Sequence, residues 1–152
     1  MKKIMLLFVL LAFATSLFGS DPFVGSWKLN SAKTQYTAGS APKAVMIVVE
    51  EQDKNLHITA SGTASDGAPI KVSYTVPKEG GAATVETGEA WDSIMVKRID
   101  DHTRENTYMK AGTVIMTRKL VVAEDGKTMT SIVDGTNAKG VKVSGTDFYD
   151  KQ

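Results

Sequence analysis

Residues 43–63 read KAVMIVVEEQDKNLHITASGT, and their pattern recurs along the rest of the chain. Apolar side chains, many of them β-branched, recur at every second position on both sides of the polar turn Asp53-Lys54-Asn55. A period of two is that of a β-strand, and a short polar turn between two such runs is typical of a β-hairpin. The stretch therefore predicts two antiparallel strands that share one apolar face.

The same pattern continues to the end of the chain. Ten runs are predicted as strands: 24–30, 43–52, 55–63, 69–76, 82–87, 93–99, 103–110, 113–123, 127–134 and 141–149. Their connections are short and rich in turn residues, as at Asp66-Gly67 and Asp125-Gly126. No segment repeats apolar residues at helical spacing over three turns, so the crossovers that a parallel sheet needs are missing. We expect an all-β chain of consecutive antiparallel hairpins.

About ten antiparallel strands with one apolar face can close into a barrel or divide into a sandwich. Closure removes the two edges of the sheet and buries the apolar face. We therefore predict a single antiparallel up-and-down β-barrel of about 8–10 strands, with a sandwich as the alternative. Small and β-branched side chains are expected to line its interior, namely Val45, Ile47, Ile58, Ala60, Val72 and Val143.

One segment of the chain is similar in sequence to another. Residues 45–67 align without gaps on residues 118–140, and identical pairs include Gly62 with Gly135 and Gly67 with Gly140. Duplication and shared turn chemistry both explain such a similarity. The alignment places Arg118 where the first hairpin has the inward-facing Val45, so a charged side chain is expected inside the barrel.

The first twenty residues differ in composition from the rest. Lys2 and Lys3 precede the apolar run Ile4–Ala14, and the small residues Gly19 and Ser20 follow. This order is typical of a secretory signal peptide, and the run is shorter than the ~20 residues of a spanning helix. We expect a signal peptide at 1–20, one domain at 21–152 and an exported protein without a membrane span.

Composition excludes several classes of function. Without Lys2 and Lys3, 16 basic residues remain against 17 acidic ones, a net charge of −1, so no nucleic-acid partner is implied. The chain of 152 residues has no Cys, which excludes disulfides, a thiol nucleophile and thiolate metal sites. Such a domain is long enough to be stabilised by its own core.

Three stretches together resemble a known superfamily. They are residues 21–29, DPFVGSWKL; residues 117–127, which include Thr117-Arg118-Lys119-Leu120; and residues 139–151, which include Thr146-Asp147-Phe148-Tyr149. The first is similar to the Gly-x-Trp opening of the calycins, which comprise lipocalins and fatty-acid-binding proteins. The other two resemble strands of the fatty-acid-binding branch. The resemblance implies a calycin-like barrel whose base is closed by Gly25 and Trp27, in an exported bacterial lipocalin-like domain.

The same resemblance implies a ligand site with two departures from the family. Arg118 and Tyr149 match positions that hold a ligand carboxylate, whereas Asp147 stands where the family has a second Arg. The segment between Asn30 and Lys43 is too short for the helix pair that covers the family's barrel. The entrance is therefore expected to be different or more open.

Arg118 is expected on an inward face that also has Val114, Met116, Leu120 and Val122, and Asp147 on an inward face as well. A cation in such a place needs an anion. Two arrangements are open: Arg118 pairs with Asp147, or Asp147 turns to the rim and Arg118 faces a ligand carboxylate beside the Tyr149 hydroxyl. Tyr74 and Trp91 are the remaining candidates for ligand contacts, Trp91 because it falls in a loop at the rim.

No catalytic motif is present in the sequence. His57 alternates with apolar neighbours and is expected to point outward, and His102 falls in a turn, so neither has metal-ligand spacing to the other. We expect no cofactor and no metal. The sequence predicts a monomeric, non-enzymatic carrier or scavenger of a small hydrophobic ligand, such as a lipid, in the periplasm or secreted. The alternative is a secreted barrel that binds another protein through its loops or surface, for example as an inhibitor.

Overall fold

The computed structural model describes residues 19–87, 91–137 and 139–152. Most of the predicted signal peptide, residues 1–18, lies outside the described residues, as do residues 88–90 and 138. Within the described ranges, no helix has the length and apolar character needed to cross a membrane.

All of the elements in these ranges are strands. In chain order they are β1 (Gly25–Leu29), β2 (Gln35–Ala38), β3 (Ala44–Gln52), β4 (Asn55–Thr63), β5 (Pro69–Pro77), β6 (Gly80–Ala82), β7 (Thr84–Thr87), β8 (Ser93–Arg98), β9 (Thr103–Lys110), β10 (Thr113–Val122), β11 (Thr128–Thr136) and β12 (Lys142–Lys151). Each of the ten predicted runs contains a strand, which confirms the all-β prediction. The prediction missed β2, and the run 82–87 is divided between β6 and β7.

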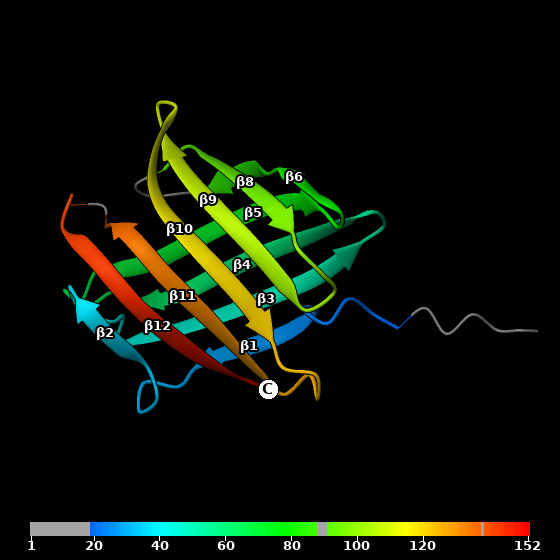
Figure 1. The fold of residues 1–152 in the computed structure, drawn as a ribbon, viewed down its shortest axis with the longest axis horizontal. Coiled ribbons are helices and arrows are strands. Elements are labelled where there is room, and N and C mark those ends of the chain that lie inside the picture. Colours follow the sequence, from blue (N-terminus) through cyan, green and yellow to red (C-terminus); the bar gives the residue numbers. More distant parts are fainter. Residues whose placement is uncertain (1–18, 88–90, 138) are drawn as a thin grey trace, which may run out of the picture.

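The strands form one antiparallel sheet that closes on itself almost completely. Its order is β6-β8-β9-β10-β11-β12-β1-β3-β4-β5-β7, and β2 pairs with β12. The two ends of this order, β6 and β7, are separated in the chain by Ala83 alone, so one continuous segment pairs first with β8 and then with β5. Figure 1 shows β8 to β12 in front and β3 to β5 crossing behind them. The barrel prediction is confirmed, and the sandwich alternative is wrong.

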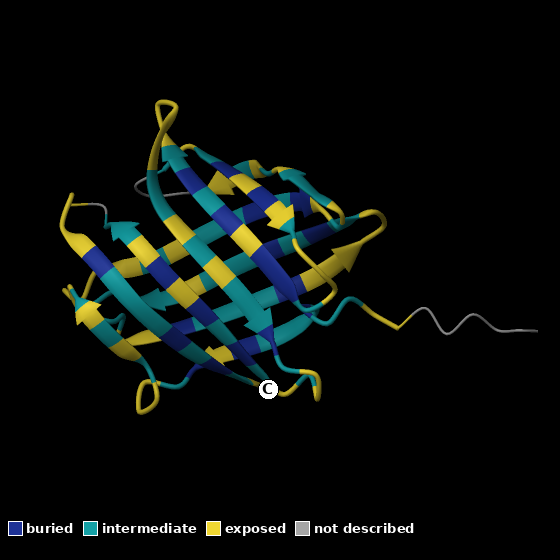
Figure 2. Cartoon of the chain, in the orientation of Figure 1, coloured by how far each residue is buried: buried dark blue, intermediate teal, exposed yellow. Residues whose placement is uncertain are grey.

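Inward and outward residues alternate along the strands, as Figure 2 shows. On β4, for example, Leu56 and Ile58 are buried and their neighbours are less so. All six side chains expected in the interior line the cavity described below. Removal of apolar side chains from the outer solvent into the barrel is the main stabilising contribution.

One expectation about β10 is wrong. Simple alternation places Val114 on the inward face with Arg118, but Val114 is 55% exposed. The register of β10 against β9 shifts between Val114 and Met116, which is a β-bulge. A bulge inserts an extra residue into one strand, so the side chains before it point to the opposite face of the sheet. Ile115 consequently lines the interior in place of Val114.

The base of the barrel is built around β1. Trp27 is fully buried, and its indole Nε1 donates a hydrogen bond to the carbonyl oxygen of Phe23 at 2.8 Å. The ammonium of Lys151 lies 4.9 Å from the centre of the Trp27 ring. Gly25 has a φ of +132°, and a Cβ there would lie 2.6 Å from the Lys151 side chain. A glycine at this position therefore adopts the positive φ without strain and leaves room for the Lys151 side chain to reach the Trp27 ring.

Candidate functional site

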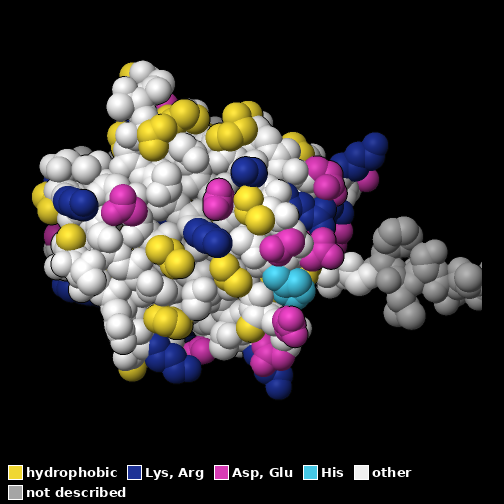
Figure 3. All heavy atoms as spheres, viewed as in Figure 1, with side chains coloured by type: hydrophobic (Ala, Val, Ile, Leu, Met, Phe, Trp, Pro, Cys, Tyr) yellow, Lys and Arg dark blue, Asp and Glu magenta, His cyan; other side chains and the backbone are white. Residues whose placement is uncertain are grey.

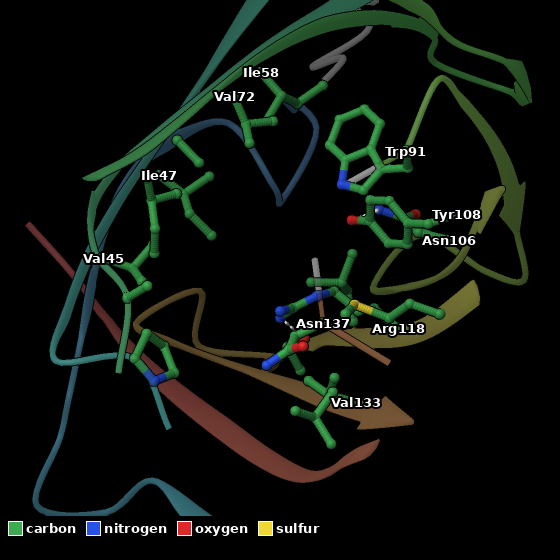
Figure 4. A pocket seen from close by; sticks show the side chains of 18 of the residues that line it. Val45, Ile47, Ile58, Val72, Trp91, Asn106, Tyr108, Arg118, Val133 and Asn137 are labelled. Atoms are coloured by element: carbon green, nitrogen blue, oxygen red, sulfur yellow. Dashed lines mark hydrogen bonds between the residues drawn. The ribbon is translucent and has the colours of Figure 1, made fainter. Parts of the chain in front are cut away.

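The inner faces of the strands enclose a cavity of about 400 Å³. It extends from the buried residues Phe23 and Arg104 at one end, the base, to the exposed β4–β5 and β11–β12 turns at the other end, here called the mouth. Figure 4 shows the middle of this cavity from close by. Such a volume lies within the range of sites that hold small organic molecules.

One wall of the cavity is aliphatic. It is formed by β3, β4 and β5, which contribute Val45, Ile47, Val49, Leu56, Ile58, Ala60, Ile70, Val72 and Val76. In Figure 4, Val45, Ile47, Ile58 and Val72 face the open centre from this side. Apart from the Tyr74 hydroxyl on β5, this part of the cavity offers van der Waals contact but neither charge nor side-chain hydrogen bonds.

The opposite wall holds a buried ion pair, here called the inner ion pair. Nη1 of Arg118 on β10 donates to Oδ2 of Asp147 on β12 at 2.9 Å and to Oγ of Ser131 on β11 at 3.2 Å. The other carboxylate oxygen of Asp147 accepts a hydrogen bond from the Tyr36 hydroxyl at 3.1 Å. Of the two arrangements left open by the sequence, the structure therefore has the internal pair.

The two partners of the inner ion pair differ in exposure. The Asp147 side chain is 0% exposed, whereas that of Arg118 is 25% exposed. Arg118 lines the cavity, and Figure 4 shows its guanidinium group projecting into the open centre. The cavity consequently displays N–H donors of Arg118, and the carboxylate that balances its charge is hidden behind them.

The tyrosine hydroxyls along the cavity stay protonated. Burial, followed by the nearby Asp147 carboxylate, raises the pKa of Tyr36 and of Tyr149 well above the usual value for tyrosine. Burial also raises the pKa of Tyr74. Near neutral pH these hydroxyls are therefore uncharged groups that can donate hydrogen bonds.

An aromatic group joins the two walls, where Tyr74 of β5 meets Trp91 and Tyr108 near β8 and β9. The rings of Trp91 and Tyr108 are 5.3 Å apart between centroids, and Tyr74 meets Trp91 edge to face at 6.4 Å. Between the two tyrosines, Nδ2 of Asn106 lies 3.5 Å from the Tyr74 hydroxyl and 3.4 Å from that of Tyr108. Figure 4 shows Trp91 and Tyr108 projecting into the cavity beside Arg118.

Two further ion pairs stand at the ends of the cavity. At the base, Nη2 of Arg104 donates to Asp21 at 2.6 Å, and the guanidinium lies 5.0 Å from the centre of the Phe23 ring. At the mouth, the Lys139 ammonium donates to Asp66 at 2.5 Å across the β4–β5 and β11–β12 turns. We call these the base ion pair and the mouth ion pair.

The structure brings all of the sequence-predicted ligand residues to this cavity. Arg118, Tyr149, Tyr74 and Trp91 line it, and Asp147 lies directly behind Arg118. Gly25 and Trp27 lie at the base.

The sequence reasoning missed the residues Tyr36, Arg104, Asn106, Tyr108 and Ser131. Arg104, Asn106 and Tyr108 alternate along β9 and all are buried, so the period of that strand contained the signal for them. No comparable signal marked Tyr36, because β2 has only four residues.

Polar groups of a hydrolytic type also meet on the outer face of the barrel. The Ser73 hydroxyl donates to Glu86 at 2.6 Å, and Nε2 of His57 lies 3.2 Å from the same hydroxyl. The hydroxyl proton of Ser73 is therefore directed to a carboxylate rather than to the imidazole, and none of the three residues lines the cavity. In the described part of the chain, no group of three or more His, Asp or Glu side chains could hold a metal ion.

Comparisons with known proteins add a likeness of overall shape. No family model and no curated protein matches the sequence. Two similar solved structures are those of apocrustacyanin C1 and apocrustacyanin C2, each 14% identical to this chain with a TM-score of 0.43 over 87% of its length. The chain spans 61% of the length of each of those chains.

Proposed function

We propose that the protein is an exported bacterial carrier or scavenger that binds a small hydrophobic molecule inside its barrel, without catalysing a reaction. The observation that carries this proposal is the cavity of about 400 Å³, which is walled on one side by aliphatic side chains and is open at the mouth. A well-packed core leaves few voids larger than a water molecule, so an apolar space of this size favours a ligand.

The outer surface supports the same proposal over docking of a protein. Large hydrophobic side chains are exposed there, including Met95 and Ile132. On the face shown in Figure 3, hydrophobic side chains are scattered among charged ones. Isolated exposed hydrophobic residues are ordinary in globular proteins.

A pair of variants on β5 tests the location of the ligand. Val72 lines the cavity, whereas its neighbour Lys71 is exposed. We expect Val72→Trp to fill the cavity and abolish binding of the neutral dye Nile red, and Lys71→Trp to leave binding unchanged. Equal binding by both variants would place the dye outside the barrel.

Mass spectrometry under non-denaturing conditions tests the natural ligand and the export. Freshly purified protein is expected to carry a lipid-sized adduct, and the mature chain is expected to begin at Ser20 or Asp21. A barrel that is reproducibly empty and captures a protein from the envelope fraction would favour the protein-binding alternative. An intact N-terminus in that fraction would contradict export through a cleaved signal.

A further inference from the structure

The charges that line the cavity cancel within the chain. Among the described residues, four charged side chains line it: Asp66, Arg104, Arg118 and Lys139. Each has an ion-pair partner in the same chain, through the base, inner and mouth ion pairs. An anionic ligand would therefore find no cation whose charge is still uncompensated.

The inner ion pair also determines which chemical groups reach the ligand. Asp147 is 0% exposed and is held by Arg118 and Tyr36, so its oxygens are turned away from the cavity. Arg118 is 25% exposed and projects into the cavity with Trp91 and Tyr108. These three side chains carry N–H or O–H donors, whereas the facing wall is aliphatic apart from Tyr74.

We infer that the ligand is an uncharged, largely apolar molecule with a hydrogen-bond acceptor oxygen, such as an ester or ketone, which Arg118 recognises from the donor-bearing wall. This inference rests on the proposed function and specifies its ligand class. A free carboxylate would give up its hydration in the cavity and would face the Arg118–Asp147 pair as a second anion. A neutral carbonyl accepts the same hydrogen bond without that cost.

Three compounds of similar size and different head groups test the inference: tridecane, methyl laurate and lauric acid. Displacement of Nile red at about pH 7.5, where lauric acid is ionised, gives their relative affinities. We expect methyl laurate to bind at least about tenfold more tightly than laurate, because burying an unpaired charge costs more than one hydrogen bond returns. We expect tridecane to bind several-fold more weakly than methyl laurate because it leaves the Arg118 donors unused.

Charge-removing variants test whether the inner ion pair causes the preference for methyl laurate over laurate. Asp147→Asn should tighten laurate binding by about tenfold and leave methyl laurate nearly unchanged, because Arg118 is then a free cation. The double variant Arg118→Gln/Asp147→Asn should lose that gain. Glu79→Gln is the matched control, because Glu79 pairs with Arg98 at 2.8 Å on the surface and its loss changes the net charge equally.

The outcomes separate the inference from the proposed function. Laurate binding to the wild-type protein as tightly as methyl laurate would overturn the inference and leave the carrier function standing. Failure of Nile red and of all three compounds to bind would overturn both. If Asp147→Asn does not fold, the relative affinities of laurate and methyl laurate for the wild-type protein still test the inference. As the pH falls toward about 4 and lauric acid becomes neutral, its affinity should rise while that of methyl laurate stays constant.

Discussion

Each end of the barrel has an ion pair of one acidic and one basic residue. The pair at the base is buried, and the pair at the mouth is exposed. In the base ion pair, Arg104 and Asp21 are 4% and 8% exposed. In the mouth ion pair, Lys139 and Asp66 are 68% and 40% exposed. Coulomb interactions are strong in a dry interior and weak in water, and desolvation makes a buried charge depend on its partner. The base ion pair is therefore a fixed part of the fold, whereas the mouth ion pair can break at little cost.

The largest difference between the two ends is expected from their tryptophans. Trp27 is fully buried at the base, whereas Trp91 is only partly buried near the mouth. Trp27→Ala should lower the free energy of unfolding by about 4 kcal/mol, as for large aromatic deletions in cores. Trp91→Ala should lower it by less than half as much. Urea unfolding followed by circular dichroism measures both, and equal losses would show that Trp27 has no special role in the base.

The base ion pair is expected to give the next largest effect. Nε and Nη1 of Arg104 have no hydrogen-bond partner among the described residues, so Asp21 is the anion that stabilises its buried charge. Asp21→Ala should therefore cost about 3 kcal/mol of unfolding free energy. Glu79→Ala, which removes the partner of Arg98 at the surface, serves as the control and should leave the urea midpoint unchanged. A similar midpoint for both variants would contradict a buried base pair.

Breaking the inner ion pair is expected to cost an unfolding free energy between the values expected at the base and at the mouth. Asp147→Ala leaves Arg118 and the Tyr36 hydroxyl without their acceptor. Because Arg118 faces the cavity and gains access to water there, we expect a loss of about 2 kcal/mol, less than at the base. The same urea titration measures it. A loss larger than that of Asp21→Ala would mean that the middle of the barrel is drier than its closed end.

Sequence alone was sufficient for the walls of the barrel, because period and turn chemistry are local properties. Gly62 and Gly135, which are aligned in the similar segments 45–67 and 118–140, show why. A Cβ at Gly62 would lie 2.0 Å from the carbonyl oxygen of Ala44, and one at Gly135 would lie 2.3 Å from that of Ile115. Both glycines let one strand approach its neighbour closely, so shared strand geometry accounts for the identity of these two aligned residues.

The parts that the sequence did not predict depend on contacts between distant segments. The bulge that turns Val114 outward arises from the register of β10 against β9. Tyr36 reaches Asp147 across 111 positions of the chain because β2 pairs with β12. The inner ion pair was one of two arrangements open at the sequence level, and only the placement of β2, β10, β11 and β12 together distinguishes them.

The smallest effect is expected at the mouth. A hydrogen bond from the Lys139 ammonium, followed by one from the backbone N–H of Ala68, lowers the pKa of Asp66 below the ordinary value of an aspartate. A carboxyl group whose pKa is lowered by folding stabilises the protein above its unfolded pKa, and this contribution is lost as the pH falls through the folded pKa. Removal of Lys139 should therefore matter only above about pH 4, and only slightly for so exposed a pair.

Lys139→Ala tests this expectation at the residue itself. The pKa of Asp66 should rise toward its ordinary value but not reach it, because the Ala68 N–H still donates to the carboxylate. An NMR titration of the Asp66 carboxyl carbon measures the shift, and the urea midpoint at neutral pH should not change measurably. An unchanged Asp66 pKa would mean that the mouth ion pair is open in solution. A clear loss of stability would mean that the mouth ion pair, like the base ion pair, stabilises the fold.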